Sequence, residues 1–238
     1  NLAIGRDALG GAVAGGEYNV AVGNYTLDAL TSGDNNVAVG YNAGTALTTG
    51  YNNTFIGRDA GLANTTGGTN TFIGFDAGKT GTTGSRNTAV GHATYDGGAT
   101  SEGDNTAIGY YALGGAVNGA EFNTVVGSYA GDAITTGDNN NIFGYQAGGA
   151  ITEGNNNVLI GNSAGTLITT GTHNIGIGIL ALSGFDAEAH NLAIGRDALG
   201  GAVAGGEYNV ALGNYTLDAL TSGDYNTALG YSAASGLT

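Results

Sequence analysis

The stretch Asn70-Thr71-Phe72-Ile73-Gly74 decides the fold, because the pattern it carries returns along the whole chain. The pattern is Asn-x-x-(large apolar)-Gly, and it occurs fourteen times at intervals of 17 or 18 residues. We number each repeat unit from its asparagine, which is position one. A fixed short period is typical of repeat proteins, in which every unit adopts the same structure. The asparagines at position one are Asn1, Asn19, Asn36, Asn53, Asn70, Asn87, Asn105, Asn123, Asn140, Asn157, Asn174, Asn191, Asn209 and Asn226.

A slower repeat lies on top of the short one. Residues 1–34 return as residues 191–224 with a single change, from Val22 to Leu212. The long period is therefore 190 residues, or eleven short units. We expect residues 1–238 to be one repeat array, with a super-repeat over 1–190 and a second copy beginning at 191. We also expect this array to be a segment of a longer fibre.

Composition excludes several classes of protein. The 238 residues include 48 Gly and no Pro, Cys, Met or Trp, and the formal net charge is −14. Without Cys there is no disulfide framework, and so negative a chain repels nucleic acid. No apolar run has the length of a membrane-spanning helix, so we expect no membrane insertion. Disorder is the rival interpretation, but the hydrophobic residues, 41% of the chain, recur at fixed positions, which favours a folded array.

The period predicts an all-β fold. Units of 17–18 residues rich in Gly, Asn and Thr are too short, and too poor in helix formers, for two helices. Two short strands fit: one over the Asn-x-x-(apolar)-Gly pattern and a second around Leu47-Thr48-Thr49. In the first strand, positions two and four share one face and position three lies on the other. We therefore predict a parallel β-solenoid, or β-roll, of about fourteen coils.

Stacked coils place like positions in ladders. We expect an Ile/Val ladder inside at position four and stacked, hydrogen-bonded asparagine amides at position one. The glycine at position five is expected at a sharp turn that requires positive φ. The candidate ladder residues are Asn19, Asn36, Asn53, Asn70, Asn87, Asn105, Gly23, Gly40, Gly57, Gly74, Ile56, Ile73 and Ile108.

A single coil offers only three or four sizeable apolar side chains, and so thin a core needs reinforcement. Because disulfides are excluded, we expect self-association, with the faces of positions two and four buried between chains. An intertwined or side-by-side homotrimer closes that face completely.

Two segments carry a resemblance to a known family. Asn70-Thr71-Phe72-Ile73-Gly74 and the segment from Asn105 to Leu113 resemble the head repeats of trimeric autotransporter adhesins. They are even more similar to the Asn-Thr-Ala-Ile-Gly repeats of tail-fibre-domain proteins of phages and bacteria. The resemblance covers the whole chain, although the unit is longer than in autotransporter heads. It implies a trimeric parallel β-roll, used as an extracellular stalk or adhesive fibre at a cell surface or on a virion.

Metal and catalytic sites find little support in the sequence. We place His92, His173 and His190 at different points of the repeat and expect no stacked metal site from them. Four acids lie in Gly-Asp-(Asn/Tyr) turns, where carboxylate and amide oxygens are candidate Ca²⁺ ligands: Asp34, Asp104, Asp138 and Asp224. The competing interpretation is a solvated acidic rim. We expect no other cofactor and no enzymatic activity.

Two surface features have binding interpretations. Tyr41, Tyr110, Tyr145 and Tyr231 follow the turn glycine, where they either stack on sugar rings of a cell-surface glycan or pack over the turn or an interface. Adjacent threonines such as Thr48-Thr49 suggest ice binding as a remote alternative. An ice-binding face needs Thr-x-Thr, whereas adjacent strand residues point to opposite faces.

The sequence thus predicts the structural shaft of an extracellular fibre that self-associates into a homotrimer and a longer filament. The alternative is an adhesive module that binds glycan or calcium through its tyrosine-rich or acidic surface.

Overall fold

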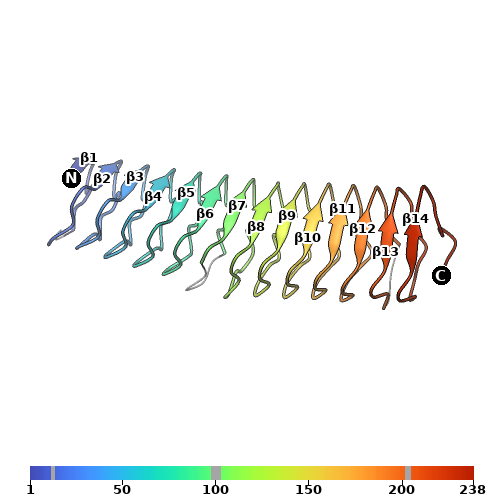
Figure 1. Ribbon diagram of the computed structural model, residues 1–238. Helices are drawn as coiled ribbons and strands as arrows, with labels where there is room; N and C mark the ends of the chain where they lie inside the picture. Colours follow the sequence, from blue (N-terminus) through green and yellow to red (C-terminus); the bar gives the residue numbers. More distant parts are fainter. Residues whose placement is uncertain (12–13, 98–102, 202–204) are drawn as a thin grey trace. The chain divides into compact units, whose positions relative to one another are not determined.

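The computed structural model of the protein describes residues 1–11, 14–97, 103–201 and 205–238. The chain divides into two compact units, Asn1–Glu121 and Phe122–Thr238. Each unit is an all-β parallel solenoid in which consecutive strands lie side by side in sequence order (Figure 1). The described residues include no helix, and therefore none that could cross a membrane.

Every strand has three residues and occupies positions two to four of its coil. The strands of the first unit are β1 (Leu2–Ile4), β2 (Val20–Val22), β3 (Val37–Val39), β4 (Thr54–Ile56), β5 (Thr71–Ile73), β6 (Thr88–Val90) and β7 (Thr106–Ile108). Those of the second unit are β8 (Thr124–Val126), β9 (Asn141–Phe143), β10 (Val158–Ile160), β11 (Ile175–Ile177), β12 (Leu192–Ile194), β13 (Val210–Leu212) and β14 (Thr227–Leu229). Neighbours within a unit pair in register, as Phe55 with Phe72 in β4 and β5. The prediction of a parallel solenoid of about fourteen coils is confirmed.

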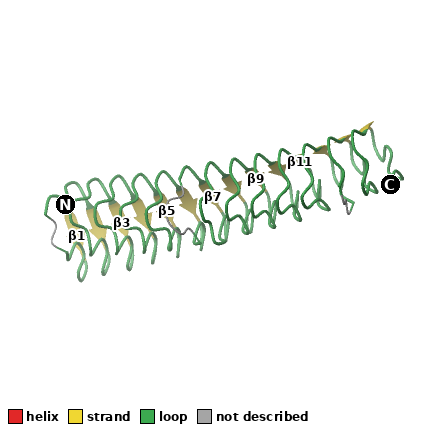
Figure 2. Ribbon diagram, turned by 90° about the horizontal axis from the view of Figure 1, so that it is seen from below, coloured by secondary structure: helices red, strands yellow, loops and turns green. Residues whose placement is uncertain are grey.

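The expected second strand around Leu47-Thr48-Thr49 is wrong, because this segment is a bend (Figure 2). Its backbone still bonds between coils: the Thr48 N–H donates to the Thr65 carbonyl over 2.7 Å. The coil turns too often for a second strand. In residues 19–35, for example, Tyr25, Leu27 and Asn35 have φ of 59°, 51° and 57°, and such left-handed residues bend the chain sharply.

In β2 to β13, position three is buried and position four is not, so the strands contribute position three to the core. Ala21, Phe55 and Leu159 at position three are fully buried. The position-four side chains of Ile56 and Ile108 are instead 38% and 40% exposed, and Ile73 is half-buried. The predicted Ile/Val ladder therefore does not lie inside its own coil. Strand alternation sends positions two and four outward together once position three points in.

Candidate functional site: the outer face of the strands

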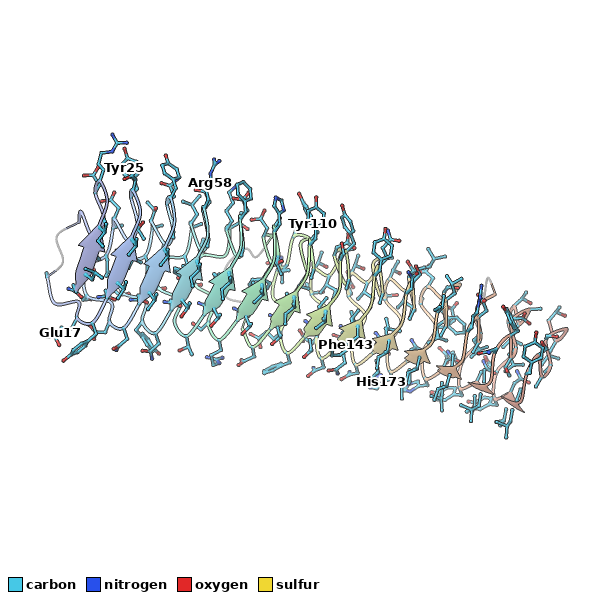
Figure 3. All side chains as sticks on the ribbon, turned by 90° about the horizontal axis from the view of Figure 1, so that it is seen from above. Glu17, Tyr25, Arg58, Tyr110, Phe143 and His173 are labelled. Carbon is cyan, nitrogen blue, oxygen red and sulfur yellow. The ribbon has the colours of Figure 1, made fainter. Side chains whose placement is uncertain are left out.

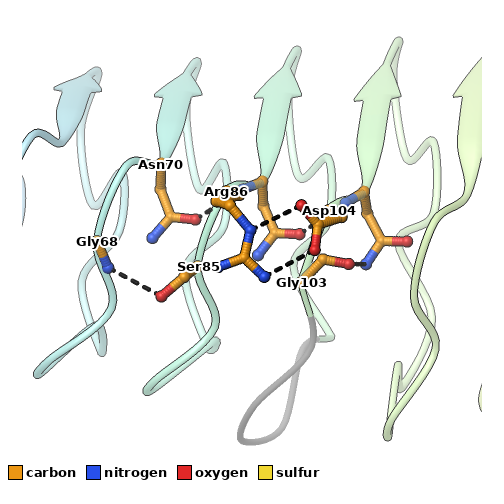
Figure 4. Close-up of polar contacts among 8 residues, drawn as sticks. Gly68, Asn70, Ser85, Arg86, Gly103 and Asp104 are labelled. Carbon is orange, nitrogen blue, oxygen red and sulfur yellow. Dashed lines mark hydrogen bonds and ion pairs between the residues drawn. The ribbon is translucent and has the colours of Figure 1, made fainter.

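The asparagines at position one form a buried ladder that fixes the register of the coils (Figure 4). The Asn70 N–H donates to Asn53 Oδ1 over 2.9 Å, and the Asn87 N–H donates to Asn70 Oδ1 over 2.9 Å. The Asn70 amide also donates to the Gly84 carbonyl over 2.8 Å. Asn19, Asn36, Asn53, Asn70, Asn87 and Asn105 are all at most 1% exposed. Each buried amide is therefore matched by partners, which favours a structural role.

The glycine at position five lies where the backbones of consecutive coils approach closely. A Cβ on Gly57 would lie 2.2 Å from the carbonyl oxygen of Gly74, so no larger residue fits there. Gly23, Gly40, Gly57 and Gly74 also have φ between +136° and +143°, which side chains disfavour.

Positions two and four of the strands together form a face that we call the outer face. In each unit it is a parallel array of mainly Val, Ile, Leu and Thr, and none of its residues is charged. Figure 3 shows Phe143, one of its residues, beside β9; its side chain is 39% exposed. Exposed apolar patches larger than a few hundred Å² are unusual on monomers and mark surfaces that contact something else.

A second surface feature is a column of rings at position six of the first unit. In consecutive coils this column contains Tyr41, Arg58, Phe75, His92 and Tyr110. The His92 ring is stacked between Phe75 and Tyr110, with centroids 5.0 and 5.2 Å away. The Arg58 guanidinium lies over both the Phe75 and Tyr41 rings, 5.3 and 5.9 Å from their centroids. Figure 3 shows Arg58 and Tyr110 projecting from one edge of the strands.

This stacking bears on the predicted glycan-binding tyrosines. A sugar ring stacks on an open aromatic face, whereas in this column Phe75 and Tyr110 each turn one face to the His92 ring. Tyr41 and Tyr145 each meet another tyrosine, Tyr25 and Tyr129, at nearly perpendicular angles of 88° and 90°. Tyr231 is 76% exposed and similarly meets Tyr215 at 78°.

A third column, which we call the corner column, comprises the residues that directly precede the position-one asparagines. All of its residues have positive φ, from Tyr18 at 58° to Tyr225 at 59°. Our placement of the histidines was wrong here: His173 and His190 both belong to this column and stack at 4.9 Å. Each directly precedes a position-one asparagine, so the two histidines occupy the same point of the repeat. The exposed ring of His173 projects outward (Figure 3).

The four candidate calcium ligands are not brought together. Asp34, Asp138 and Asp224 lie two residues before a position-one asparagine, whereas Asp104 lies in the corner column. The Asp34 and Asp224 carboxylates each accept an N–H of the preceding coil, from Glu17 and Glu207 respectively. No group of three or more His, Asp or Glu that could hold a metal ion occurs among the described residues.

Asp104 forms an ion pair with Arg86 of the preceding coil (Figure 4). Both carboxylate oxygens accept from the guanidinium over 2.7 Å. These hydrogen bonds from Arg86 hold the pKa of Asp104 below its usual value, although burial opposes the shift. The carboxylate is thus engaged in joining two coils.

The threonine pairs do not build a Thr-x-Thr array. The Thr48 hydroxyl donates to the Thr65 carbonyl over 3.0 Å, while Thr49 is exposed on the bend. Threonines do follow one another on the outer face at position two of β4 to β7, where they alternate with Ile or Val at position four.

Within the part of the chain that the structure describes, the surface has no pocket. The outer face, the position-six column and the corner column remain as its candidate contact surfaces. No protein-family model, no curated protein sequence and no solved structure matches this chain.

Proposed function

We propose that this chain is part of the structural shaft of an extracellular fibre, in which parallel copies bury their outer faces against one another. The observation that carries the proposal is the outer face itself, which is apolar, uncharged and continuous over the strands of each unit. Three parallel copies around one axis would hide this face completely. The resemblance of the repeats to tail-fibre and adhesin segments supports the same arrangement.

The energetics of association favour this role. Ile56, Ile108, Ile160 and Ile194 are each about two-fifths exposed in the single chain. Burying the rest of one such side chain contributes roughly 1 kcal/mol at the usual coefficient for apolar area. The contribution recurs in every coil, so its sum grows with length, whereas the entropic cost of bringing chains together is met once.

As a shaft, the protein needs no active site and no cofactor. Its work is to supply length and stiffness through ladders of hydrogen bonds, outside the cell, on a cell surface or a virion. We propose self-association as its main interaction. The second candidate is an adhesive module that binds glycan through exposed tyrosines; the 76% exposure of Tyr231 is the observation in its favour.

The test is the solution mass by light scattering, measured with and without EDTA. We expect three times the 23.3 kDa chain mass in both conditions. The variant Ile73→Asp places a charge on the outer face and is expected to weaken association, so that the assembly separates into single chains at a higher protein concentration than the wild type does. Thr66→Asp is the matched control, because Thr66 is exposed on the bend of the preceding coil and away from the outer face.

Two outcomes would overturn the proposal. If the wild-type protein has the mass of one chain, its outer face is not buried against other copies and the proposal is wrong. A mass that falls on chelation indicates assembly held by a metal ion rather than by apolar contact.

A further inference from the structure

The corner column of the second unit contains a stack of four rings in consecutive coils. They are His173, His190, Tyr208 and Tyr225, with successive centroids 4.9, 4.8 and 5.0 Å apart. The last two rings are nearly parallel, at 4°, and their side chains are 44% and 74% exposed. Tyr208 and Tyr225 are therefore two accessible phenols held face to face.

The backbone fixes this pair from both sides. The Tyr225 N–H donates to the Glu207 carbonyl over 3.0 Å, and the Glu207 N–H donates to Asp224 Oδ1 over 2.8 Å. Both tyrosines share the left-handed conformation of the column, with φ of 56° and 59°, so their side chains leave the coil in the same direction. Groups held together in this way react with each other far faster than the same groups free in solution.

The composition of the chain makes tyrosine its most easily oxidised side chain. It contains no Cys, Met or Trp, and it has 13 Tyr. Hydrogen peroxide acting through a peroxidase removes one electron and one proton from each of two phenols and is itself reduced to two water molecules. The two phenoxyl radicals then form a carbon–carbon bond between their ortho positions. The ring hydrogens at those carbons move to the oxygens, so the product is dityrosine and the chain has lost two hydrogen atoms.

We propose that Tyr208 and Tyr225 are a modification site at which peroxidase-type oxidation joins adjacent coils through a dityrosine bond. The bond restricts the unfolded chain as a disulfide would and so stabilises the folded coils. This modification goes beyond the proposed shaft function. It does not depend on self-association, because both rings belong to one chain.

The internal duplication provides a matched control. Tyr18 is the duplicate of Tyr208, and the two copies differ only at Val22 and Leu212 before residue 35, where Asn35 takes the place that Tyr225 has in the second copy. Tyr18 consequently has Asn35 as its neighbour in the next coil. The two copies thus present the same phenol with and without a tyrosine partner.

The experiment treats the dilute, purified protein with a peroxidase and hydrogen peroxide, then digests it at aspartate. Asp218 and Asp224 separate the two tyrosines, so a cross-link leaves two joined peptides. We expect a joined pair of peptides, two hydrogens lighter than the sum of its parts, whose fragmentation places the link at Tyr208 and Tyr225, in protein that migrates as a single chain on a denaturing gel. Dityrosine fluorescence should rise in parallel.

Three variants sharpen the result. Tyr225→Phe is expected to lose the joined pair and the larger share of the fluorescence, whereas Tyr18→Phe retains both. Asn35→Tyr is expected to gain a second joined pair, between residues 18 and 35. Thermal melting confirms that each variant is folded.

The proposal is overturned if the wild type yields only covalent dimers, with no joined pair within one chain. It is equally overturned if a folded Asn35→Tyr gains no link, since the same geometry would then have failed to couple the rings.

Discussion

At the scale of single residues, the asparagine ladder shows how a polar group can recur in the core of a narrow coil. The repeat predicted that asparagines stack, since position one is always Asn. It did not reveal the backbone partners, because these depend on how the rest of the coil folds back. The Asn70 amide reaches the carbonyl of Gly84, fourteen residues further along the chain. Only the closed path of the coil brings these two groups together.

Replacing one of these asparagines should leave buried groups without partners. In Asn70→Ala, the Asn87 N–H loses its acceptor and the Gly84 carbonyl loses its donor. Each of these two orphaned buried groups costs about 1–3 kcal/mol, so we expect the free energy of unfolding to fall by roughly 2–6 kcal/mol. Urea denaturation measures the change. The exposed control Thr66→Ala should shift it by under about 0.5 kcal/mol, and equal effects of the two variants would contradict the structural role.

At the scale of the coil, the interior accepts a large side chain at position three or at position nine, but not at both. Residues 53–69 pair Phe55 with Gly61, and residues 19–35 pair Ala21 with Leu27. A Cβ on Gly61 would lie 2.8 Å from Phe55 Cε1. The repeat pattern was enough to predict where the strand at positions two to four lies. It did not predict which face of that strand is buried, because the narrow interior selects side chains by fit and not by size. Ranking by size placed Ile at position four inside, whereas the coil encloses position three, which is often Ala.

This complementarity predicts a compensating pair of substitutions. Gly61→Leu alone should clash with the phenyl ring, and Phe55→Ala alone should leave a cavity costing about 3–5 kcal/mol. The double variant recreates the Ala and Leu arrangement of residues 19–35 and should regain about 0.5–3 kcal/mol relative to the sum of the single effects. Recovery stays incomplete because Phe72, stacked 5.4 Å from Phe55, loses its neighbour. Thermal and urea melts of all four proteins measure the coupling.

The matched control combines Phe55→Ala with Gly165→Leu, which lies in the second unit beside Leu159. These two changes share no contact, so their effects should add. If the Phe55 and Gly61 changes were also additive, the two positions would not share one space.

At the scale of the whole molecule, the strands within each unit pair with their neighbours in the sequence. The period predicted this organisation, because a single repeating unit can only stack on its own kind. The outer face was harder to interpret from sequence. An apolar residue gives the same sequence pattern whether it is buried within its own coil or between chains. Its role depends on partners, and one chain's sequence does not specify their number.

Nearest-neighbour stacking predicts that damage stays local. Phe55→Ala should speed amide hydrogen exchange in β3, β4 and β5, because these coils share the packing of that ring. Exchange in β11 and β12 of the second unit should remain unchanged. Hydrogen exchange followed by mass spectrometry resolves the two regions, and a uniform rise along the chain would show that the array unfolds as one cooperative block.

Every column repeats in register from one coil to the next. This regularity allows recombination within the gene to change the number of coils. The nearly identical copies at residues 1–34 and 191–224 begin eleven whole coils apart. Unequal recombination between their coding sequences would add or delete 190 codons in a single event. Each coil at the junction would still meet the neighbour it already has, so no asparagine, glycine or core pairing would be interrupted. Length can therefore vary among descendants in steps of eleven coils, without a single new contact having to evolve.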